Sequence, residues 1–428
     1  MFENFRENID VDGLKVAVVN LGCAKNLVDG EVIISSLIDS GIELCENVED
    51  ADIVIVNTCG FIQSASLESI NTLLELSRSK KVIAIGCLVE RYKDELVKSM
   101  PEVDVFFGTD SANSLLKLFK KPQIELKRRI HTTGVYTYLK ISEGCNRLCS
   151  FCVIPKIRGR HRSRVIDDIL SEAKILLSRG ARELCIVSQD TGYYGKDLHD
   201  GTNLLKLLSE LEKLDGRFWV RLFYLYPTDL NKELIEFIRD SEKVIPYFDI
   251  PLQHISDNIL KSMRRGYSKK EIYNLLELIY KSIPNAIIRT TFIVGYPSET
   301  DGDFKELIDF VSEGHIHWLG AFAYSPEEGT NAFELGDRLS RKEKNARLRA
   351  IYETQKSITL KKNRALVGSK LEVLVEGFEG PILYGRSKLN APEVDGAIYI
   401  QSERELKPGD FILAKVAGAK EYDLKVVF

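Results

Sequence analysis

Long apolar runs are absent from this sequence. Stretches such as VAVV (16–19) and DIVIV (52–56) fall far short of the ~20 apolar residues that cross a bilayer. The opening residues MFENFRENIDVDG (1–13) carry acidic side chains and lack the apolar segment of a secretory signal. We therefore expect a cytoplasmic protein with no membrane segment.

A surplus of positive charge is also absent. The chain has 59 Lys and Arg against 63 Asp and Glu, a net charge of −4, so the molecule as a whole carries no nucleic-acid footprint. The six histidines show no metalloprotease spacing, and no GxxxxGKS/T phosphate loop or recognisable Ser/His/Asp arrangement exists. These absences leave the cysteines as the most informative side chains.

The cysteines belong to a chain of ordinary globular composition. Its 428 residues predict two or three domains, and 44% hydrophobic with 29% charged residues is typical of a protein with a substantial core. In a reducing cytoplasm, cysteines serve more often as ligands or nucleophiles than as disulfides. The eight cysteines are Cys23, Cys45, Cys59, Cys87, Cys145, Cys149, Cys152 and Cys185.

The first part of the chain, from residue 15 to about 125, alternates short apolar runs with helical periodicity. This pattern predicts an open parallel α/β sheet. The polar, basic stretch 120–134 reads as a linker, so we expect an N-terminal domain at 14–130. Its strands are expected at KVAVVN (15–20), DIVIVN (52–57), KVIAIG (81–86) and VDVFFG (103–108).

A second series of strand–helix repeats starts at Val135. Six such repeats predict an incomplete TIM-like (β/α)6 barrel over 131–361, ending in a long charged helix at about 340–362. The tail 364–428 has strand-like runs punctuated by Gly and Pro, which predict a small β-barrel. The strands of the partial barrel are expected at 135–142, 183–190, 218–227, 247–254, 287–297 and 317–326.

Three cysteines, the barrel triad, follow the first of these strands as Cys145-x3-Cys149-x2-Cys152. The end of a strand is the catalytic face of a TIM-type barrel, and thiolates at this spacing can converge on one iron–sulfur cluster. A cubane cluster has four ligand positions and no fourth cysteine is near, so one iron is open to a non-protein ligand. A zinc knuckle is the alternative, but His161, the nearest candidate for a fourth ligand, is nine residues past Cys152.

Three more cysteines, the N-terminal triad, each follow a predicted strand: Cys23, Cys59 and Cys87. Ligands of open α/β sheets bind outside the carboxyl ends of the strands. A glycine neighbour lets backbone approach a bulky group closely, and each of these cysteines has one, in order Gly22, Gly60 and Gly86. Singly, each cysteine reads as a small buried residue, as do Cys45 and Cys185; together, the three predict a second metal site.

With both triads in place, the chain resembles the radical S-adenosylmethionine (SAM) methylthiotransferases over nearly its whole length. The resemblance implies an N-terminal methylthiotransferase domain (14–130), a radical SAM core (131–361) and a C-terminal TRAM domain (364–428). Several segments are more similar to the members that modify a ribosomal protein than to those that modify tRNA. They are LGCAKNLVDGE (21–31), NTCGFI (57–62), CVIPKIRGRHRSR (152–164), SQDTGYYGKDL (188–198), DIPLQHISD (249–257) and APEVDGAIYI (391–400).

The resemblance implies a reaction with two 4Fe-4S clusters. The barrel triad would hold the cluster that binds SAM, whose reductive cleavage gives a 5′-deoxyadenosyl radical. That radical would take a hydrogen from the β-carbon of an aspartate in small-subunit ribosomal protein twelve. The N-terminal triad would hold the cluster that presents the sulfur, methylated by a second SAM. No side chain other than the cysteines receives a role in this scheme.

The implied partners are this ribosomal protein, within the ribosome or an assembly intermediate, and an electron donor such as flavodoxin or ferredoxin. Neither tRNA nor a membrane is expected. The tail supports a protein target, since its nine Lys and Arg against ten Asp and Glu do not suit a phosphate backbone. On this view, deleting 364–428 should abolish modification and spare uncoupled 5′-deoxyadenosine formation.

A basic run follows the barrel triad, and two further segments resemble cofactor-contacting regions. The run reads either as a solvated loop or as a loop facing an anion, namely the cofactor carboxylate, the target aspartate or ribosomal RNA. The segments IVGYPSET (293–300) and SQDT (188–191) are expected near the adenosyl group. The basic residues are Lys156, Arg158, Arg160, Arg162 and Arg164.

Two alternatives stay open. One is a methylthiotransferase that acts on a modified adenosine next to the anticodon of tRNA. The other is a non-catalytic iron–sulfur or zinc protein that serves as an electron carrier or binding module. The open iron of the barrel triad argues against the carrier, because a carrier would ligate its cluster completely.

Overall fold

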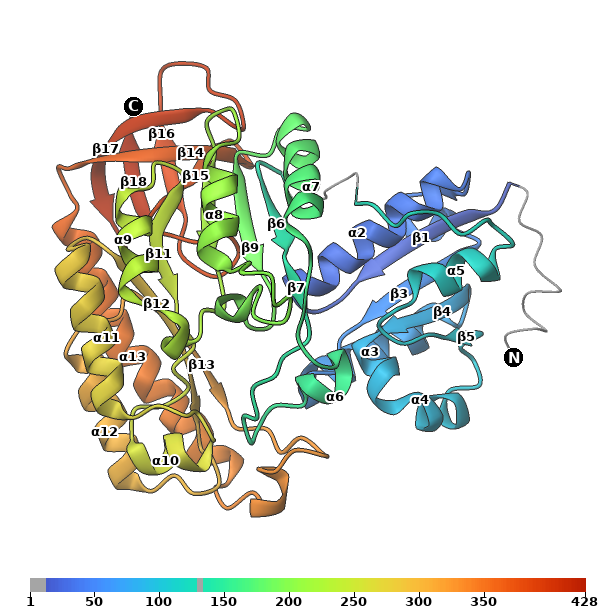
Figure 1. Cartoon of the computed structure of the whole chain (residues 1–428), viewed down its shortest axis with the longest axis horizontal. Coiled ribbons are helices and arrows are strands. Elements are labelled where there is room, and N and C mark those ends of the chain that lie inside the picture. Colours follow the sequence, from blue (N-terminus) through green and yellow to red (C-terminus); the bar gives the residue numbers. More distant parts are fainter. Residues whose placement is uncertain (1–12, 129–133) are drawn as a thin grey trace. The chain divides into compact units, whose positions relative to one another are not determined.

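The structure is a computed structural model that describes residues 13–128 and 134–428 (Figure 1). The described chain divides into two compact units. Unit 1 holds the described residues up to Arg128 together with Tyr138–Asn146 and Val153–Arg162, and unit 2 holds the rest. The expectations for residues 1–12 and for the linker residues 129–133 lie outside the described residues. No helix in the described ranges is long and apolar enough to cross a membrane.

Unit 1 is built on an open, parallel five-stranded sheet with the order β2-β1-β3-β4-β5. This confirms the predicted fold class of the N-terminal part. Every residue of the central strand is buried, as expected of a parallel strand rich in Ile and Val that is covered on both faces. The strands are β1 (Lys15–Asn20), β2 (Glu43–Leu44), β3 (Ile53–Thr58), β4 (Lys81–Gly86) and β5 (Val105–Phe106).

Helices cover both faces of this sheet because side chains alternate along each strand. Ile53 and Ile55 belong to the buried cluster that includes residues of α2 and α5. Val54 and Val56 belong to the cluster that includes residues of α3 and α4. The helices are α2 (Ala24–Asp39), α3 (Gln63–Leu76), α4 (Cys87–Ser99) and α5 (Ala112–Leu118), with a 3₁₀ turn at Val48–Asp50.

Unit 1 also takes in short elements from either side of the barrel triad. These are β7 (Ser142–Glu143) and α6 (Ile154–Arg158). β7 pairs with β8 (Arg162–Ser163) in a two-stranded sheet.

Unit 2 contains the strands of a partial barrel, in the order β13-β12-β11-β10-β9-β6. Neighbours from β9 to β13 pair in parallel, which confirms the predicted incomplete (β/α)6 architecture. The edge strand β6 begins in unit 2 and ends in unit 1. The strands are β6 (Tyr136–Lys140), β9 (Glu183–Val187), β10 (Trp219–Leu222), β11 (Val244–Asp249), β12 (Ile287–Val294) and β13 (Trp318–Ala323).

The helices of unit 2 begin where the sequence supplies capping residues. In α11, α12 and α13 a Ser or Thr side chain and an acidic residue three positions on form a capping box, which satisfies backbone N–H groups of the first turn. The long charged helix α13 packs against β13 and α12 (Figure 1). The helices are α7 (Ile166–Ser178), α8 (Leu204–Glu212), α9 (Lys232–Asp240), α10 (Asp257–Ser262), α11 (Lys269–Ser282), α12 (Asp301–Ser312) and α13 (Arg341–Ala365); 3₁₀ turns lie at Thr191–Tyr193, Pro227–Asp229 and Phe333–Leu335.

The tail forms the predicted small closed barrel, with the order β14-β15-β16-β18-β17. Along β17 buried and exposed residues alternate, so one face fills the barrel and the other meets solvent. The strands are β14 (Lys370–Glu379), β15 (Ile382–Ser387), β16 (Ile398–Gln401), β17 (Phe411–Ala419) and β18 (Leu424–Val427).

This small barrel covers the amino ends of the strands of the partial barrel. Trp219, which opens β10, packs edge-on against Phe411 with ring centroids 5.1 Å apart. Gly409 lies beside Arg182 and Val135, the residues just before β9 and β6. The tail therefore sits opposite the carboxyl ends, where barrel enzymes carry their active sites.

The loop between β15 and β16 (388–397) enters the partial barrel. Arg221 of β10 donates to the carbonyls of Ser387 and Lys388 at 3.2 and 3.3 Å. Trp318 Nε1 donates to the Leu389 carbonyl at 2.6 Å. Further along the loop, the Tyr247 hydroxyl donates to Asp395 at 2.5 Å. The tail is thus part of the interior packing of unit 2 and not a loosely attached module.

A buried ionic group lies at the centre of this packing. Glu183 accepts from Arg221 at 2.5 Å and pairs with Arg386 of the tail at 2.6 Å. Arg386 also pairs with Glu376, and the side chains of Glu183 and Arg221 are fully buried. Burial opposes ionisation of Glu183, but the two arginines hold the pKa of its carboxyl below the usual value.

We predict that Glu183→Gln destabilises unit 2 by about 3 kcal/mol, because it leaves buried arginines short of a negative charge. Both tryptophans, Trp219 and Trp318, lie in unit 2, so urea unfolding followed by tryptophan fluorescence measures the effect. The difference in unfolding free energy between the parent and Glu183→Gln should become smaller as pH falls below about 4. At that pH the unfolded parent chain binds a proton at the Glu183 carboxyl.

The matched control is Glu372→Gln. Glu372 pairs with Arg217 and Lys388 within unit 2, but the Arg217 side chain is 65% exposed. Removing an exposed pair costs less than about 1 kcal/mol. Equal losses in the two variants would contradict the role assigned to burial.

Candidate functional site

The N-terminal triad lies at the carboxyl edge of the sheet in unit 1. Cys23 follows β1 as the N-cap residue of α2, Cys59 comes directly after β3, and Cys87 opens α4 after β4. Since β1, β3 and β4 are adjacent and parallel, their carboxyl ends meet at one edge. Cys23 and Cys87, which are 64 positions apart in the sequence, therefore lie at the same edge of the sheet.

Two glycines allow the loops that carry these thiols to close on one another. Gly22 has φ +87°, and a Cβ there would lie 2.6 Å from Cys59 Cβ and 2.9 Å from its Sγ. A Cβ on Gly60 would lie 2.6 Å from Leu88 Cα. The space that these two side chains would need is already occupied by Cys59 and by the backbone of α4. This thiol-only donor set fits a group that is bound through sulfur.

The three thiols differ in their readiness to ionise. Cys23 is exposed, whereas Cys59 and Cys87 are buried. At Cys23, Lys25 and the backbone N–H groups that open α2 outweigh desolvation and lower the pKa of the thiol. Burial raises the pKa of Cys59, and it raises that of Cys87 to about 12 although Arg158 acts in the opposite direction.

Arg158 and Asn26 contact the buried thiol of Cys87. Arg158 donates to Cys87 Sγ from Nε at 3.3 Å and from Nη2 at 3.1 Å. The amide nitrogen of Asn26 donates to the carbonyls of Leu21 and Thr58 at 3.1 and 3.0 Å. This fixes the amide oxygen of Asn26 on the side of Cys87 and Arg158, at 3.5 and 2.5 Å.

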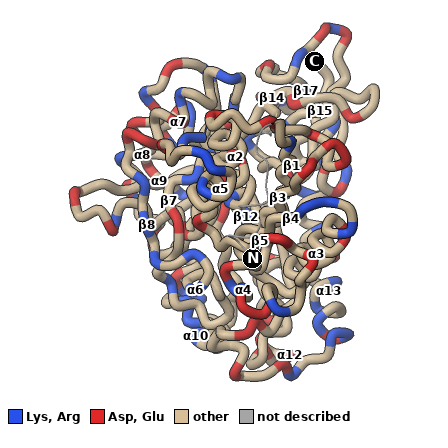
Figure 2. The backbone as a smooth tube through the Cα atoms, turned by 90° about the vertical axis from the view of Figure 1, so that its right-hand side faces the viewer, with Lys and Arg blue, Asp and Glu red and all other residues tan. Residues whose placement is uncertain are grey.

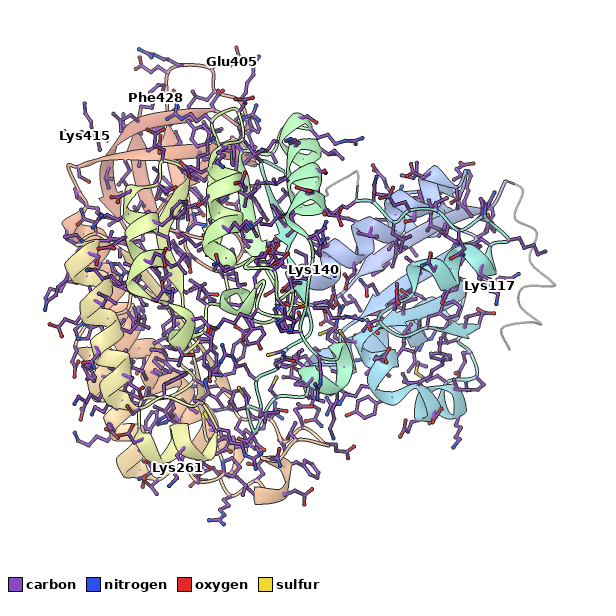
Figure 3. The ribbon with its side chains drawn as sticks, viewed as in Figure 1. Lys117, Lys140, Lys261, Glu405, Lys415 and Phe428 are labelled. Atoms are coloured by element: carbon purple, nitrogen blue, oxygen red, sulfur yellow. The ribbon has the colours of Figure 1, made fainter. Side chains whose placement is uncertain are left out.

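Acidic residues hold the other edge of the Arg158 guanidinium. Nη1 donates to Asp29 at 2.6 Å and to Glu143 at 3.4 Å. Lys140, labelled in Figure 3, pairs with the same two carboxylates, at 2.8 Å for Glu143. Although burial opposes ionisation of Asp29, Lys140 and Arg158 lower the pKa of its carboxyl.

The basic run contains exposed residues and one buried residue, Arg158, which neither a solvated loop nor contact with an external anion describes. The chain around α6 is mainly basic (Figure 2), and Lys156, Arg160 and Arg162 are exposed there. Arg158 is instead buried, with 4% of its side chain exposed, and faces the anionic groups of unit 1. In unit 2, Arg164 pairs with Glu172 at 2.8 Å.

The barrel triad lies on a loop that passes from unit 1 to unit 2 after Asn146. In unit 1, the N–H of the buried Cys145 donates to the Gly159 carbonyl at 3.1 Å. Gly144 has φ +77°, and a Cβ there would lie 2.2 Å from the Arg160 carbonyl oxygen. The close approach of these two backbone segments requires glycine at this position.

In unit 2, the loop continues through Cys149 and Cys152. The N–H of Cys152 donates to the Cys149 carbonyl at 3.1 Å. Arg265 donates from Nη1 to Cys149 Sγ at 3.1 Å. Arg265 is itself held by the Tyr267 hydroxyl and the Pro251 carbonyl, both at 2.7 Å. A buried guanidinium therefore contacts one sulfur of this triad, as Arg158 does in the other.

Arg147, inside the CxxxCxxC motif, is fixed by two carboxylates of unit 2. It pairs with Asp190 at 2.7 Å and with Asp229, and its guanidinium lies 3.8 Å from the ring centre of Tyr226. Lys196 also pairs with Asp229, at 2.6 Å. Burial raises the pKa of Asp190, and its Oδ1 has no hydrogen-bond partner among the described residues.

The segment after β12 is shaped by Glu299. Its carboxylate accepts from the N–H groups of Gly295 and Tyr296, at 3.1 Å for Tyr296, and pairs with Arg347 at 2.7 Å. The Tyr296 hydroxyl lies 2.8 Å from that of Ser150, which belongs to the cysteine loop. Glu299 thus stabilises the turn that contacts this loop.

Sequence reasoning identified the cysteines and included Arg158 in the basic run, but it did not predict that Arg158 or Arg265 contacts a cysteine sulfur. Arg265 stands in the unremarkable run SMRRGY, and nothing local indicates that it reaches Cys149. The position of Arg147 could have been noticed in the sequence. It stands between Cys145 and Cys149, so its charged side chain must start from the cysteine loop itself. Among the described residues, no three His, Cys, Asp or Glu side chains are grouped closely enough to hold a single metal ion.

Three family models match the chain. Residues 15–108 match an uncharacterized protein family, UPF0004, residues 139–311 match the radical SAM superfamily, and residues 367–428 match the TRAM domain. Together these matches extend over most of the described chain.

Close relatives match almost end to end. The chain is 55% identical to the ribosomal protein uS12 methylthiotransferase RimO of Aquifex aeolicus, over 96% of each chain. It is 46% identical to the protein of that name from Sulfurihydrogenibium sp., over 94% of this chain and 96% of the relative. For Thermoanaerobacter sp. the identity is 42%, over 96% and 98%.

Solved structures share the fold at low sequence identity. The radical SAM methyltransferase TsrM of Kitasatospora setae, with cobalamin and a 4Fe-4S cluster bound, gives a TM-score of 0.58 at 14% identity, over 74% of this chain and 73% of that chain. The cobalamin-dependent radical SAM enzyme OxsB gives 0.53 at 13%, over 80% and 56%. These likenesses concern the fold alone.

We predict that Gly22→Ala destabilises unit 1 more than Gly41→Ala does. Both glycines have positive φ, which costs an L-residue about 1–2 kcal/mol. A Cβ on Gly41 meets nothing within 4 Å, whereas one on Gly22 collides with Cys59, which adds about 1–3 kcal/mol of overpacking. Thermal unfolding followed by circular dichroism measures the difference; equal shifts would contradict the close packing of Gly22 on Cys59.

Proposed function

Because this chain belongs to the family of radical SAM ribosomal protein uS12 methylthiotransferases, we propose that it attaches a methylthio group to the β-carbon of an aspartate in uS12. The chain is a radical SAM methylthiotransferase. It matches enzymes named for that substrate over nearly its full length, at 55% and 42% identity. The tRNA alternative is not favoured, because the relatives compared are named for uS12. An iron–sulfur cluster and SAM follow from the radical SAM family.

The finer proposal concerns the ligands. Cys145, Cys149 and Cys152 hold the cluster that binds SAM, and the N-terminal triad holds a second cluster. The observation that carries the second assignment is the meeting of three thiols at the carboxyl ends of adjacent parallel strands. Open α/β sheets bind ligands there, and the loops that carry the thiols pack closely on one another at Gly22 and Gly60.

When bound, the two clusters and SAM supply the radical, the methyl group and the sulfur. The protein supplies position and charge. Arg265 directs an N–H toward the Cys149 sulfur, and donors to ligand sulfurs tune the potential of a cluster. Asp190 keeps a buried carboxylate oxygen beside the loop; we propose that it accepts a hydrogen bond from bound SAM. Glu299 holds the turn at 295–299.

The remaining parts of the proposal concern place and partners. We propose three functional segments at 14–130, 131–361 and 364–428, action in the cytoplasm, and reduction by a small electron carrier such as flavodoxin or ferredoxin. The tail binds the basic ribosomal protein through charge complementarity, a contact that weakens with salt.

Deletion of the tail is not a clean test of that binding. The β15–β16 loop fills the partial barrel, and Arg386 neutralises Glu183 there. Removing 364–428 would leave these groups of the barrel exposed or unpaired. Charge reversals at exposed tail positions such as Glu403 and Glu405 test substrate docking without disturbing the core.

We predict that the two triads can be separated by function. With Cys23, Cys59 and Cys87 changed to Ala, the anaerobically reconstituted protein should hold one cubane cluster instead of two. It should still convert SAM to 5′-deoxyadenosine under dithionite and form no methylthiolated product. With the barrel triad changed to Ala, one cluster should also remain, and cleavage of SAM should cease.

Iron and sulfide analysis with liquid chromatography of the nucleoside products measures both effects. The matched control is Cys45→Ala, because Cys45 lies in unit 1 beside Val16, near the amino end of β1 and away from the carboxyl edge that carries the triad. It should keep both clusters. Two clusters in the N-terminal triple variant, or loss of SAM cleavage while that variant stays folded, would contradict the assignment.

A further inference from the structure

We propose that Arg158 is a positioning residue for the N-terminal triad: it orients the Cys87 sulfur through two hydrogen bonds and raises the reduction potential of the cluster bound there. This inference rests on the proposed function, since it assumes a cluster on the N-terminal triad. It concerns a residue that is none of the ligands, and it is carried by contacts within unit 1 alone.

The geometry of Arg158 is specific to the sulfur. Two of its N–H groups, on Nε and Nη2, converge on Cys87 Sγ at 3.3 and 3.1 Å. Nη2 also donates to Asn26, and Nη1 is occupied by Asp29. A guanidinium is a rigid planar fork, so pinning Nη1 on Asp29 fixes the direction in which the Nε–Nη2 edge faces.

Both partners of this contact are buried. Cys87 is 7% exposed, and 4% of the Arg158 side chain is exposed. A cysteine that binds metal is anionic, and a buried anion requires a paired, hydrogen-bonded cation. The guanidinium of Arg158 is the cation that contacts the Cys87 sulfur.

Asp29 and Glu143 offset the charges of Arg158 and Lys140, so these four side chains form a group of zero formal charge. The carboxylates occupy Nη1, and the Nε–Nη2 edge of the guanidinium remains directed at the sulfur. Two N–H donors on a ligand sulfur stabilise the reduced, more negative cluster. The potential of that cluster is therefore expected to depend on Arg158.

The position of Arg158 in the sequence gives the contact a further consequence. Segment 145–158 carries the whole barrel triad and ends on the arginine that contacts Cys87. One continuous piece of chain thus supplies three ligands of the first proposed cluster and the counter-ion of a ligand of the second. Disturbing this segment is expected to affect both triads.

The test compares Arg158→Met, Arg158→Lys and Lys156→Met. Each is made in the full chain with the barrel triad changed to Ala, so that only the N-terminal triad can hold iron. Lys156 is exposed on the same short helix, and its substitution by Met removes the same charge as Arg158→Met. After anaerobic reconstitution, iron content and the midpoint potential are measured, the latter by a redox titration followed by electron paramagnetic resonance. Circular dichroism checks that each variant is folded.

Arg158→Met is expected to lower the midpoint potential and reduce iron uptake, Arg158→Lys to recover part of both, and Lys156→Met to match the parent. Unchanged potential and iron content in folded Arg158→Met would overturn the inference while leaving the cluster assignment intact. If the parent chain, with only the barrel triad changed to Ala, takes up no iron, the proposed cluster on the N-terminal triad is contradicted, and so is the inference about Arg158. An equal shift in Lys156→Met shows a general charge effect and also overturns the proposal.

Discussion

A charge that leaves water has to meet an opposite charge, and in this chain such pairs join segments that are distant in the sequence. Arg128 pairs with Glu31 across 97 positions, and Arg158 pairs with Asp29 across 129. Both pairs tie segments near or beyond the linker to the N-terminal sheet of unit 1. In unit 2, Glu183 and Arg386 tie the tail to the partial barrel. These pairs help to hold α6 in unit 1 and the tail in unit 2.

The same rule shapes the two cysteine sites. Each triad has a buried arginine on one of its sulfurs, Arg158 on Cys87 and Arg265 on Cys149. Each arginine is oriented by groups that use its other N–H donors, a carboxylate in one case and a hydroxyl and a carbonyl in the other. Charged donors therefore accompany both sets of thiols, although the two sites lie on unrelated sheets. This arrangement favours anionic sulfur ligands at both.

The sequence predicted what depends on local pattern. Alternating apolar runs predicted β1 and β4 to the residue, and cysteines placed after strands predicted which thiols meet at one edge. β5 covers only two residues of the expected 103–108, because few of them pair with β4. Burial of Arg158 could not be predicted, since it looks like its basic neighbours and its partner Asp29 is far away in the chain. The insertion of the β15–β16 loop also left no local signal, because it depends on carbonyl acceptors that every loop possesses.

The identity of the substrate is the central claim, and one parallel assay addresses it most directly. The reconstituted enzyme is offered purified small ribosomal subunits, free uS12 and hypomodified tRNA, and the products are analysed by mass spectrometry. The account predicts one methylthio group on an aspartate of uS12 and no change in the tRNA digest. Methylthio-adenosine in the tRNA, with the uS12 peptide unchanged, would contradict it.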